Sequence, residues 1–591
     1  MCGIFAYLGN KNNASQIVVE GLKRLDYRGY DSWGVVEASY GKLFLKKKAG
    51  KISEVMDLSS FPKGNIAIAH TRWATTGEVN DINAHPHYSS DESFALAQNG
   101  IVENYELIKK QLLAKGYKFV SQTDTEVIVR LIEEKLKSKK KLQEAVRSAF
   151  KELEGRNTII LITKNGEIIA ARNGSPLVVG INKKTDEIFI SSDTLSFANL
   201  VTDVVVMDNN QMVILNKNLD FFDITSGKRL EVKPEKMKLH SGKTTKGKYK
   251  YFMLKEIHEG PFVIEQLTKQ NKNNYIRFGK AIKKAKHVYT IGSGGAGVAA
   301  AQVAFYLRSI GKIQAVSLIG ADAIDYIDLF EKDDIIITIS QSGETADVLE
   351  VLEKAQKRGV IIASFVNMPG SMITRMSTFK FMSESGPEIC VMSTKTFDAQ
   401  VAWGYLVAKT VAGEYSDGVK NLKKLSISMK KYLSQSKNHS ELKKIAKTLV
   451  NKESIFLLAK YQNFHISREG MVKIIEASYK HGHALPSGDL KHYVITLMEE
   501  DVPVIALVSN DVAKSDIMNA IDEVRLRGAK VIAISPEPNK KFDKYIKTYD
   551  TGETSAIMNL IPLQLISCYL ADFLGNNIDK PRNIAKSVTV K

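Results

Sequence analysis

The residue with the clearest chemical potential is Cys2, which becomes the terminal residue once the initiator methionine is removed. A terminal cysteine carries a thiol and a free α-amino group, with ordinary pKa values of about 8.5 and about 7.7–8.0. Near neutral pH the amine is partly unprotonated, so it can take the thiol proton and leave a nucleophilic thiolate. Considered alone, Cys2 can equally be an incidental cysteine in a frayed terminus.

A thiolate that attacks an amide creates an oxyanion, and four further residues match the needs of that reaction. Asn99 can offer a side-chain NH₂ group and Gly100 a backbone N–H, and one such donor is worth about 10²–10³ in rate. Arg72 can bind a carboxylate through two hydrogen bonds, and Asp124 can pair with an ammonium group. Three of the four also have a plainer interpretation: Arg72 as a surface arginine, Asn99 as a turn former and Asp124 as part of a helix cap.

The elements around these residues predict an α+β domain built on antiparallel sheets. Residues 2–9 are apolar and β-prone, which is typical of a buried strand, and further strands are expected at 65–69 and 94–97. Thr123 to Glu126 fits a capping box that opens a helix. Asn165-Gly166 is a strong hairpin signal between two strands.

Five ordered motifs carry a family resemblance: Cys2-Gly3-Ile4, Tyr27-Arg28-Gly29-Tyr30-Asp31-Ser32, His70-Thr71-Arg72-Trp73-Ala74-Thr75, Asn99-Gly100-Ile101-Val102-Glu103-Asn104 and Thr123-Asp124-Thr125-Glu126. Together they resemble the N-terminal-nucleophile glutaminase domain. The resemblance implies an αββα sandwich that releases ammonia from glutamine through a thioester on Cys2. It also implies Asn99 and Gly100 as the oxyanion hole, Arg72 and Asp124 as glutamine clamps, Trp73 as a mobile lid and Thr75 as a pocket contact.

The last two thirds of the chain contain an internal repeat of strand–helix units. The segments 335–340 and 504–509 match each other, as do 360–365 and 531–535, and the main offset is 169 residues. This pattern predicts two doubly wound α/β copies.

Ligands in such folds bind at the carboxyl ends of strands, near helix N-termini. The first copy places Ser340-Gln341-Ser342-Gly343-Glu344-Thr345 there, a hydroxyl-rich turn that suits a phosphate. A simple helix cap without ligand is the alternative. The second copy has Ser509-Asn510-Asp511-Val512-Ala513, which carries a carboxylate, so phosphate binding is predicted for the first copy only. The glycine cluster 292–297 is best interpreted as a tight strand-to-helix turn.

A second set of motifs comprises Ser340 to Asp347, Ser393-Thr394-Lys395, Glu469-Gly470, Lys473, Glu476, Asp489 to His492 and the tail Pro581 to Val590. They resemble paired sugar-isomerase (SIS) domains. With the glutaminase motifs in front, the whole chain is similar to the isomerising glutamine–fructose-6-phosphate aminotransferase family. That fold is an α+β N-terminal-nucleophile sandwich followed by two α/β doubly wound SIS domains.

This resemblance implies glutamine and fructose 6-phosphate as substrates, no cofactor, and glucosamine 6-phosphate as product. Ser340, Gln341, Ser342, Thr345 and Ser393 would hold the sugar phosphate. His492 would open the sugar ring, Lys586 would form a Schiff base, and Glu476 would move a proton between C1 and C2. Ammonia would travel shielded from water, with Trp73 and the tail as seals. Three of these residues also have a structural alternative. His492 can be a buried structural histidine, Lys586 a surface lysine and Glu476 a solvated helix carboxylate.

The chain departs from both families at a few positions. Thr76 and Gln98 stand where histidines are common, Trp33 where a small residue is usual, Gly294 where a phosphate-binding serine is usual, and Tyr493-Val494 in place of Gly-Pro. These positions leave two alternatives open: an amidotransferase acting on another phosphorylated sugar, and a sugar-phosphate-sensing protein with decayed catalysis.

The predicted domains are a glutaminase at 2–235, a linker at 236–250, SIS domains at 251–430 and 431–570, and a tail at 571–591. With 591 residues and three cysteines, a disulfide scaffold is excluded. The formal net charge of +18 arises from scattered lysines and not from a stripe, which argues against nucleic acid. We expect no membrane segment and no metal, a cytoplasmic location and a homodimer.

Overall fold

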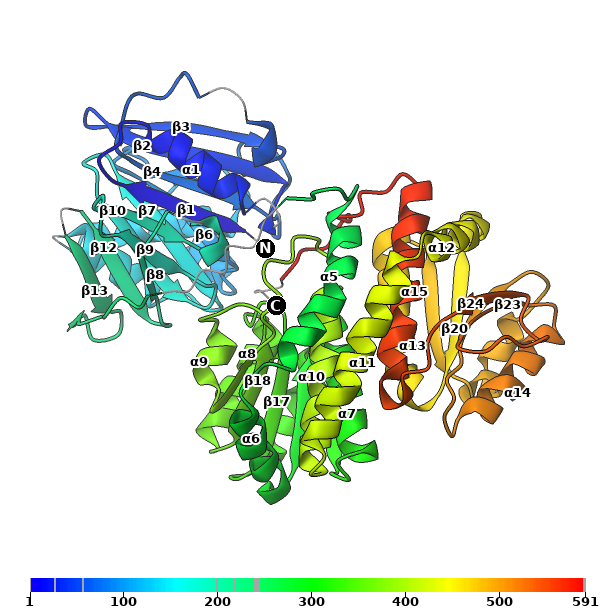
Figure 1. The fold of residues 1–591 in the computed structure, drawn as a ribbon. Helices are drawn as coiled ribbons and strands as arrows, with labels where there is room; N and C mark the ends of the chain where they lie inside the picture. Colours follow the sequence, from blue (N-terminus) through cyan, green and yellow to red (C-terminus); the bar gives the residue numbers. More distant parts are fainter. Residues whose placement is uncertain are drawn as a thin grey trace. The chain divides into compact units, whose positions relative to one another are not determined.

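The computed structural model describes residues 2–25, 28–55, 58–139, 141–197, 200–216, 218–236 and 245–587. Met1 and its removal, Tyr27 of the second motif, most of the predicted linker and the last four residues of the tail lie outside the described residues. The chain forms two compact units, Met1–Gly242 with Ala585–Lys591, and Lys243–Ile584, and each is described by itself (Figure 1).

The first unit contains two seven-stranded sheets, with strand orders β11-β9-β10-β1-β4-β2-β3 and β14-β13-β12-β8-β7-β6-β5. The first sheet consists of β1 (Gly3–Leu8), β2 (Ser32–Ser39), β3 (Lys42–Ala49), β4 (Ile66–Arg72), β9 (Val178–Asn182), β10 (Glu187–Ser191) and β11 (Asp203–Val206). The second consists of β5 (His87–Tyr88), β6 (Phe94–Gly100), β7 (Asn157–Thr163), β8 (Ile168–Asn173), β12 (Gln211–Leu215), β13 (Leu219–Asp223) and β14 (Arg229–Leu230).

Three apolar clusters show that these sheets are the middle layers of an αββα sandwich. One cluster joins inward-facing residues of both sheets, among them Ile68 and Ile160. Another packs α1 (Ala14–Lys23) on the outer face of the first sheet, and the third packs α2 (Tyr105–Ala114), α3 (Asp124–Leu136) and α4 (Leu142–Phe150) on that of the second. The predicted α+β sandwich is therefore confirmed.

The local predictions in this unit hold, with one difference at the start of α3. Thr123 caps the helix by accepting a hydrogen bond from the Glu126 N–H, as the capping box predicts. The Glu126 carboxylate, however, accepts from the backbone N–H groups of Val120 and Ser121 and from the Arg130 guanidinium. It thus fixes the chain that enters the helix.

The second unit contains two five-stranded parallel sheets, with orders β16-β15-β17-β18-β19 and β21-β20-β22-β23-β24. The first consists of β15 (Val288–Gly292), β16 (Ala315–Ile319), β17 (Ile335–Ser340), β18 (Ile361–Val366) and β19 (Phe379–Met382). The second consists of β20 (Ser454–Ala459), β21 (His481–Pro486), β22 (Pro503–Leu507), β23 (Lys530–Ser535) and β24 (Lys544–Lys547). Both copies place their five strands in the same relative order, so the predicted repeat of a doubly wound unit is confirmed.

Helices cover both sheets of this unit (Figure 1). They are α5 (Phe252–Leu267), α6 (Lys272–Lys284), α7 (Gly295–Ser309), α8 (Ala346–Lys357), α9 (Met372–Met376), α10 (Lys395–Val411), α11 (Tyr415–Ser434), α12 (Ser436–Leu449), α13 (Phe464–Ser478), α14 (Lys514–Arg525) and α15 (Ser555–Phe573). Glycine cluster 292–297 is the turn from β15 into α7, as predicted.

One segment of the described residues, Gly552–Phe573, is long and apolar enough to cross a membrane, a feature that the sequence analysis did not single out. Within its most apolar stretch of 18 residues, 89% is buried inside the protein. Packing in the core of the second unit accounts for its apolar character.

Candidate active site

Cys2 immediately precedes β1, where antiparallel pairing with β4 brings it beside the end of that strand. Gly3 lies opposite Thr71, so the Trp73 backbone N–H reaches the Cys2 Sγ at 3.3 Å. Burial raises the pKa of the thiol, while the Trp73 backbone and the Arg72 guanidinium lower it. The thiol therefore needs a base to become a nucleophile, as the terminal-amine mechanism requires.

Asn99 lies on β6, which contacts β1, and its amide is held in one orientation. The side chain is 1% exposed, and its Oδ1 lies 3.1 Å from the His70 Nε2. That nitrogen also lies 2.9 Å from the carbonyl oxygen of Gln98. Because both neighbours are acceptors, we assign the imidazole proton to Nε2. The Asn99 Nδ2 has no hydrogen-bond partner within the described part of the chain, so it can donate to an oxyanion.

Gly100 follows in a conformation that only glycine can adopt here. Its φ is +137°, and an added Cβ would lie 2.1 Å from the Arg156 carbonyl oxygen. The backbone at the predicted oxyanion hole is therefore set by steric constraint.

Arg72 and Asp124 lie within electrostatic range of Cys2, as a glutamine-binding pair would. Arg72 donates to the carbonyl oxygens of Thr76 and Glu78, the latter at 3.2 Å, which ties down the following loop. Asp124 Oδ2 accepts the Val102 N–H at 2.8 Å. Burial is the main influence on both groups: it raises the pKa of Asp124 and lowers that of Arg72, and each charge favours ionisation of the other.

The predicted lid residue, Trp73, is half-buried, and its ring meets Tyr30 edge-on at a centroid distance of 5.6 Å. Asp31 fixes the next residue by accepting the Ala74 N–H at 2.8 Å. Thr75 is exposed. The segment that follows β4 is thus held at Arg72 and Ala74 and open to solvent at Thr75.

Two of the noted departures have structural roles. Trp33 is 6% exposed and belongs to the apolar cluster beneath α1, so it is a core residue and not a pocket residue. Gln98 donates to the Asn157 Oδ1 at 2.6 Å and accepts from the Thr125 hydroxyl. It thereby links β6 to β7 and to the start of α3.

A row of three buried histidines was not assigned any role from the sequence. The rings of His70 and His85 lie 4.6 Å apart and those of His85 and His87 lie 5.1 Å apart. His87 contacts the hydroxyl of Thr123, the residue that caps α3, at 3.0 Å. Burial lowers the pKa of His70 to about 3 and that of the other two well below the ordinary value. The row therefore connects the Asn99 and Asp124 regions through neutral rings.

In the second unit, the predicted phosphate turn follows β17. Ser340 Oγ accepts the Gly343 N–H at 2.8 Å, and Ser342 Oγ accepts the Glu344 N–H at 3.2 Å. Thr345 is the cap residue of α8 but makes no capping hydrogen bond with its side chain. Gln341 is half-buried beside this turn. The first turn of α8 therefore has no side-chain cap from Thr345, and it carries the acidic residue Asp347.

The neighbouring strand β15 adds a residue that the sequence analysis missed. Ser293 follows β15, and its buried hydroxyl has no hydrogen-bond partner among the described residues. Gly294 has a φ of +57° and open space where a side chain would lie. The hydroxyl expected at 294 is thus absent, but one is present at 293.

Ser393 lies just before α10, where its hydroxyl donates to the Glu388 Oε2 at 2.9 Å. The other oxygen of Glu388 accepts the N–H groups of Thr394 and Thr396 at the start of that helix. Ser393 is therefore positioned by a capping carboxylate.

Helix α13 carries a buried ionic cluster. Lys473 is 2% exposed and lies between Glu469, at 3.3 Å, and Glu476. Burial raises the pKa of Glu469 to about 7. An added Cβ on Gly295, at the start of α7, would lie 3.1 Å from the Glu469 Oε2. This carboxylate therefore joins the second copy to the turn after β15 in the first.

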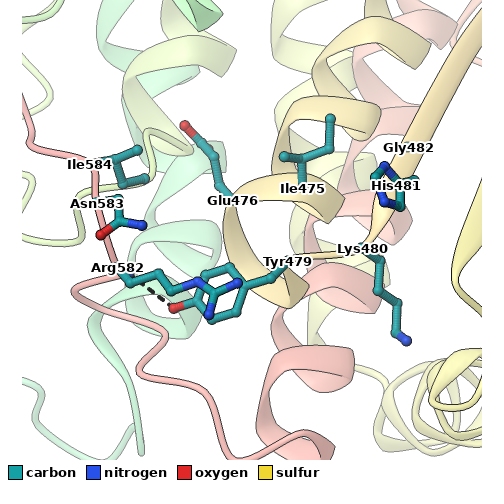
Figure 2. Close-up of a pocket in the computed structure, with 9 residues that line it drawn as sticks. All are labelled: Ile475, Glu476, Tyr479, Lys480, His481, Gly482, Arg582, Asn583 and Ile584. Atoms are coloured by element: carbon teal, nitrogen blue, oxygen red, sulfur yellow. Dashed lines mark hydrogen bonds between the residues drawn. The ribbon is translucent and has the colours of Figure 1, made fainter.

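Glu476 also lines a cavity of about 370 Å³ together with residues of the tail. Figure 2 shows Glu476 near Asn583 and Ile584, while Arg582 lies against Tyr479. The Arg582 guanidinium lies 4.2 Å from the centroid of that ring, and its backbone N–H donates to the Tyr479 hydroxyl at 3.0 Å. These contacts attach the start of the tail to α13.

His492 has no hydrogen bond or ion pair to this cluster among the described residues. His492 is exposed in the 3-10 helix η6 (Asp489–His492), followed by Tyr493, which is 58% exposed. Lys586 belongs to the first compact unit, whereas Glu476 belongs to the second. Their roles in the sugar reaction remain expectations.

Comparison with known proteins covers both units. The model of the glutamine amidotransferase domain matches residues 70–199, and that of the SIS domain matches residues 281–409 and 448–571. The glutamine–fructose-6-phosphate aminotransferase [isomerizing] of Pyrococcus horikoshii is 34% identical over 605 residues, and that of Bacteroides thetaiotaomicron is 36% identical over 624 residues. Each alignment covers 100% of both chains.

Solved structures agree for the second unit. The C-terminal domain of glucosamine-fructose-6-phosphate aminotransferase from Francisella tularensis is 27% identical, with a TM-score of 0.51 over 57% of this chain and 100% of its own. A tagatose-6-phosphate ketose/aldose isomerase described as putative, from Clostridium novyi, shares the fold with a TM-score of 0.52 and 17% identity over 57% of this chain and 93% of its own. With relatives at 34% and 36% identity along its full length, this protein belongs to the isomerising glutamine–fructose-6-phosphate aminotransferase family.

Proposed function

We propose that this protein hydrolyses glutamine at Cys2 and transfers the ammonia within the same chain to fructose 6-phosphate, producing glucosamine 6-phosphate. Family membership along the full chain supports both half-reactions. The observation that carries the glutaminase half is the buried Asn99 amide, whose Nδ2 is unpartnered in the described residues and whose Oδ1 is held by His70.

In the first half-reaction, the terminal amine takes the proton of the Cys2 thiol, and the thiolate forms a C–S bond with the γ-carboxamide of glutamine. Asn99 Nδ2 and the Gly100 N–H stabilise the oxyanion that develops. Collapse of this intermediate breaks the C–N bond, and the ammonium proton of the terminus goes to the leaving ammonia. Water then hydrolyses the thioester to glutamate. Arg72 binds the α-carboxylate and Asp124 the α-ammonium group.

In the second half-reaction, the turn Ser340–Thr345 holds the sugar phosphate at the start of α8. Ser393, which lies just before α10, also binds the phosphate. His492 opens the ring, and Lys586 forms a Schiff base with the C2 ketone, which releases water. Ammonia then adds at C2 and displaces the lysine to give the fructosimine, and Glu476 moves a proton from C1 to C2 to give the 2-amino aldose. The position of Glu476 supports this assignment, because its carboxylate forms an ion pair with Lys473 and lines the cavity beside the tail.

The proposal also includes the domain limits given under Sequence analysis. It further includes a homodimer and a cytoplasmic location. Within it, both substrates react in one chain, because free ammonia in water would protonate and lose its nucleophilicity.

The test compares the wild type with Cys2→Ala. Wild type should convert glutamine and fructose 6-phosphate to glutamate and glucosamine 6-phosphate in equal amounts. Cys2→Ala should lose the glutamine-dependent product but still make glucosamine 6-phosphate from added ammonium salts. Full glutamine-dependent activity in the variant would refute the nucleophile, and absence of product from wild type with either nitrogen source would refute the sugar reaction.

A further inference from the structure

The second SIS copy has its own cavity at the position where doubly wound folds bind ligands. In its sheet, the chain leaves β20 toward β21 on one side and leaves β22 toward β23 on the other. Ligands in such sheets bind at the carboxyl ends of the two strands where the direction reverses. In the second copy these strands are β20 and β22. The Asn463 amide, in the loop after β20, donates to the Ser509 hydroxyl, in the loop after β22, at 2.9 Å and so ties the two loops together.

A cavity of about 390 Å³ lies at this point. Tyr461 and Gln462 come from the loop after β20, and Asp511 comes from the loop after β22. Phe305 of α7, together with Glu414 and Glu553, completes the part of the lining that matters here. The volume is sufficient for a monosaccharide-sized molecule.

The anion position of this copy is already filled by the protein. Asp511 follows Ser342 by the repeat offset of 169 residues, and its Oδ1 accepts the Ala513 N–H at 2.9 Å at the start of α14. A carboxylate therefore holds the start of α14, whereas Thr345 makes no side-chain cap at α8 in the first copy. A phosphate group would be repelled here.

Gln462 supplies an acceptor that lacks a partner. Its side chain is 5% exposed, and its Nε2 donates to the Asp511 Oδ2 at 2.8 Å. This bond fixes the amide, and the Gln462 Oε1 has no hydrogen-bond partner among the residues that the structure describes. A buried carbonyl oxygen in this state favours a ligand that donates a hydrogen bond.

The charge at the cavity favours a cation. Glu414 and Glu553 both pair with Lys409, the latter at 3.2 Å, so one ammonium group serves two carboxylates. With Asp511, three carboxylates against one ammonium leave a formal excess of two negative charges. The rings of Phe305 and Tyr461 meet edge-on with centroids 4.9 Å apart and provide an aromatic wall that a cation can contact.

We propose that this cavity is a second ligand site, specific for a small hydroxylated primary amine without a phosphate group, such as an unphosphorylated amino sugar. The ammonium group pairs with the excess carboxylate charge, and a hydroxyl or ammonium N–H donates to the Gln462 Oε1. The site is distinct from the phosphate turn of the first copy and does not depend on the proposed function.

The test is calorimetric titration of the full chain with glucosamine, with glucose as the neutral probe, each with and without saturating fructose 6-phosphate. Glucosamine should bind saturably with the same affinity in both conditions, and glucose should bind at least tenfold more weakly. Glu553→Gln keeps the shape of the side chain but removes its charge and should weaken glucosamine binding about tenfold. Gln462→Leu removes the acceptor and should weaken it as well.

Asp516→Asn is the matched control, because Asp516 forms an ion pair with Lys460 in the same copy but does not line the cavity. Absence of saturable glucosamine binding would overturn the proposal, as would equal binding of glucose or competition by fructose 6-phosphate. If Gln462→Leu does not fold, Glu553→Gln decides: unchanged affinity in that variant contradicts the proposal. None of these results depends on whether the chain makes glucosamine 6-phosphate.

Discussion

Replacement of His70 by leucine should impair glutamine hydrolysis through Asn99, although His70 itself does not touch the substrate in our mechanism. The His70 Nε2 lies 3.1 Å from the Asn99 Oδ1, and both residues are buried. Loss of this donor leaves a buried acceptor unsatisfied at a cost of about 1–3 kcal/mol. The amide is then free to turn its oxygen, and not its NH₂ group, toward the oxyanion.

These magnitudes set the expected effect. Since about 1.4 kcal/mol corresponds to a factor of ten, the lost orientation should lower kcat for glutamate release by about 5- to 150-fold. The upper limit is complete loss of one oxyanion donor, about 10²–10³ in rate. KM for glutamine should change little, because Arg72 and Asp124 remain.

The assay measures glutamate release for His70→Leu, Asn99→Ala and the double variant. If His70 acts through Asn99, the double variant should be no slower than Asn99→Ala alone. Glucosamine 6-phosphate formation from ammonium salts should be unchanged in all three, which controls for folding of the second unit. His70→Gln, whose amide can still donate, should recover part of the lost rate.

His85→Leu is the matched control for a change in the same row, because no described hydrogen bond joins His85 to Asn99. Both ring nitrogens of His85 are buried without a hydrogen-bond partner among the described residues, so this variant should keep kcat for glutamate release close to that of wild type. Additive rate losses in the double variant, or equal losses in the His70 and His85 variants, would refute the positioning role.

Three further predictions concern pH and the sugar turn. Burial depresses the pKa values of His70, His85 and His87, so these rings stay neutral in the folded protein. As pH falls below 6.5, the unfolded chain binds protons that the folded protein does not, and stability is lost by about 1.4 kcal/mol per histidine and pH unit. Thermal unfolding at pH 7.5 and 5.5 should therefore show a smaller loss for His85→Gln than for wild type. Because the pKa of Glu469 is raised to about 7, wild type loses stability as pH rises from about 4.5 to 7. Glu469→Gln should therefore gain melting temperature relative to wild type between pH 5 and pH 8. A difference in melting temperature between the two proteins that does not change with pH would contradict this. In Gly343→Ala, the added Cβ would lie 2.1 Å from the Ser371 Oγ, at a backbone φ of +69°. KM for fructose 6-phosphate should therefore rise at least tenfold, and glutamate release without sugar should be unchanged. Gly386→Ala is the control, because Gly386 has a similar φ of +66° but open space where the Cβ would lie.

The sequence predicts those parts of the fold that depend on neighbouring residues. The strand that begins at Gly3, the helix opened by Thr123 and the 169-residue repeat are all visible as local patterns. The contact of His70 with Asn99 joins strands of two different sheets, and no local pattern encodes it. The place of Trp33 in the core is likewise not visible in the sequence, because it depends on the packing of α1 on the first sheet.

The repeat also shows how one fold can retain its geometry while its ligand chemistry changes. At the turn after the third strand, Ser342 of the first copy corresponds to Asp511 of the second, and both cap the backbone of their own turn. The serine hydroxyl adds no charge at this position, whereas the aspartate adds a negative charge. The residue type at this position therefore makes the turn of the second copy more negative. For this reason Asp511→Ser, which keeps a capping oxygen, should weaken glucosamine binding at the second copy and leave the KM for fructose 6-phosphate at the first copy unchanged. If both copies responded together, the two sites would not be independent and this account of the repeat would fail.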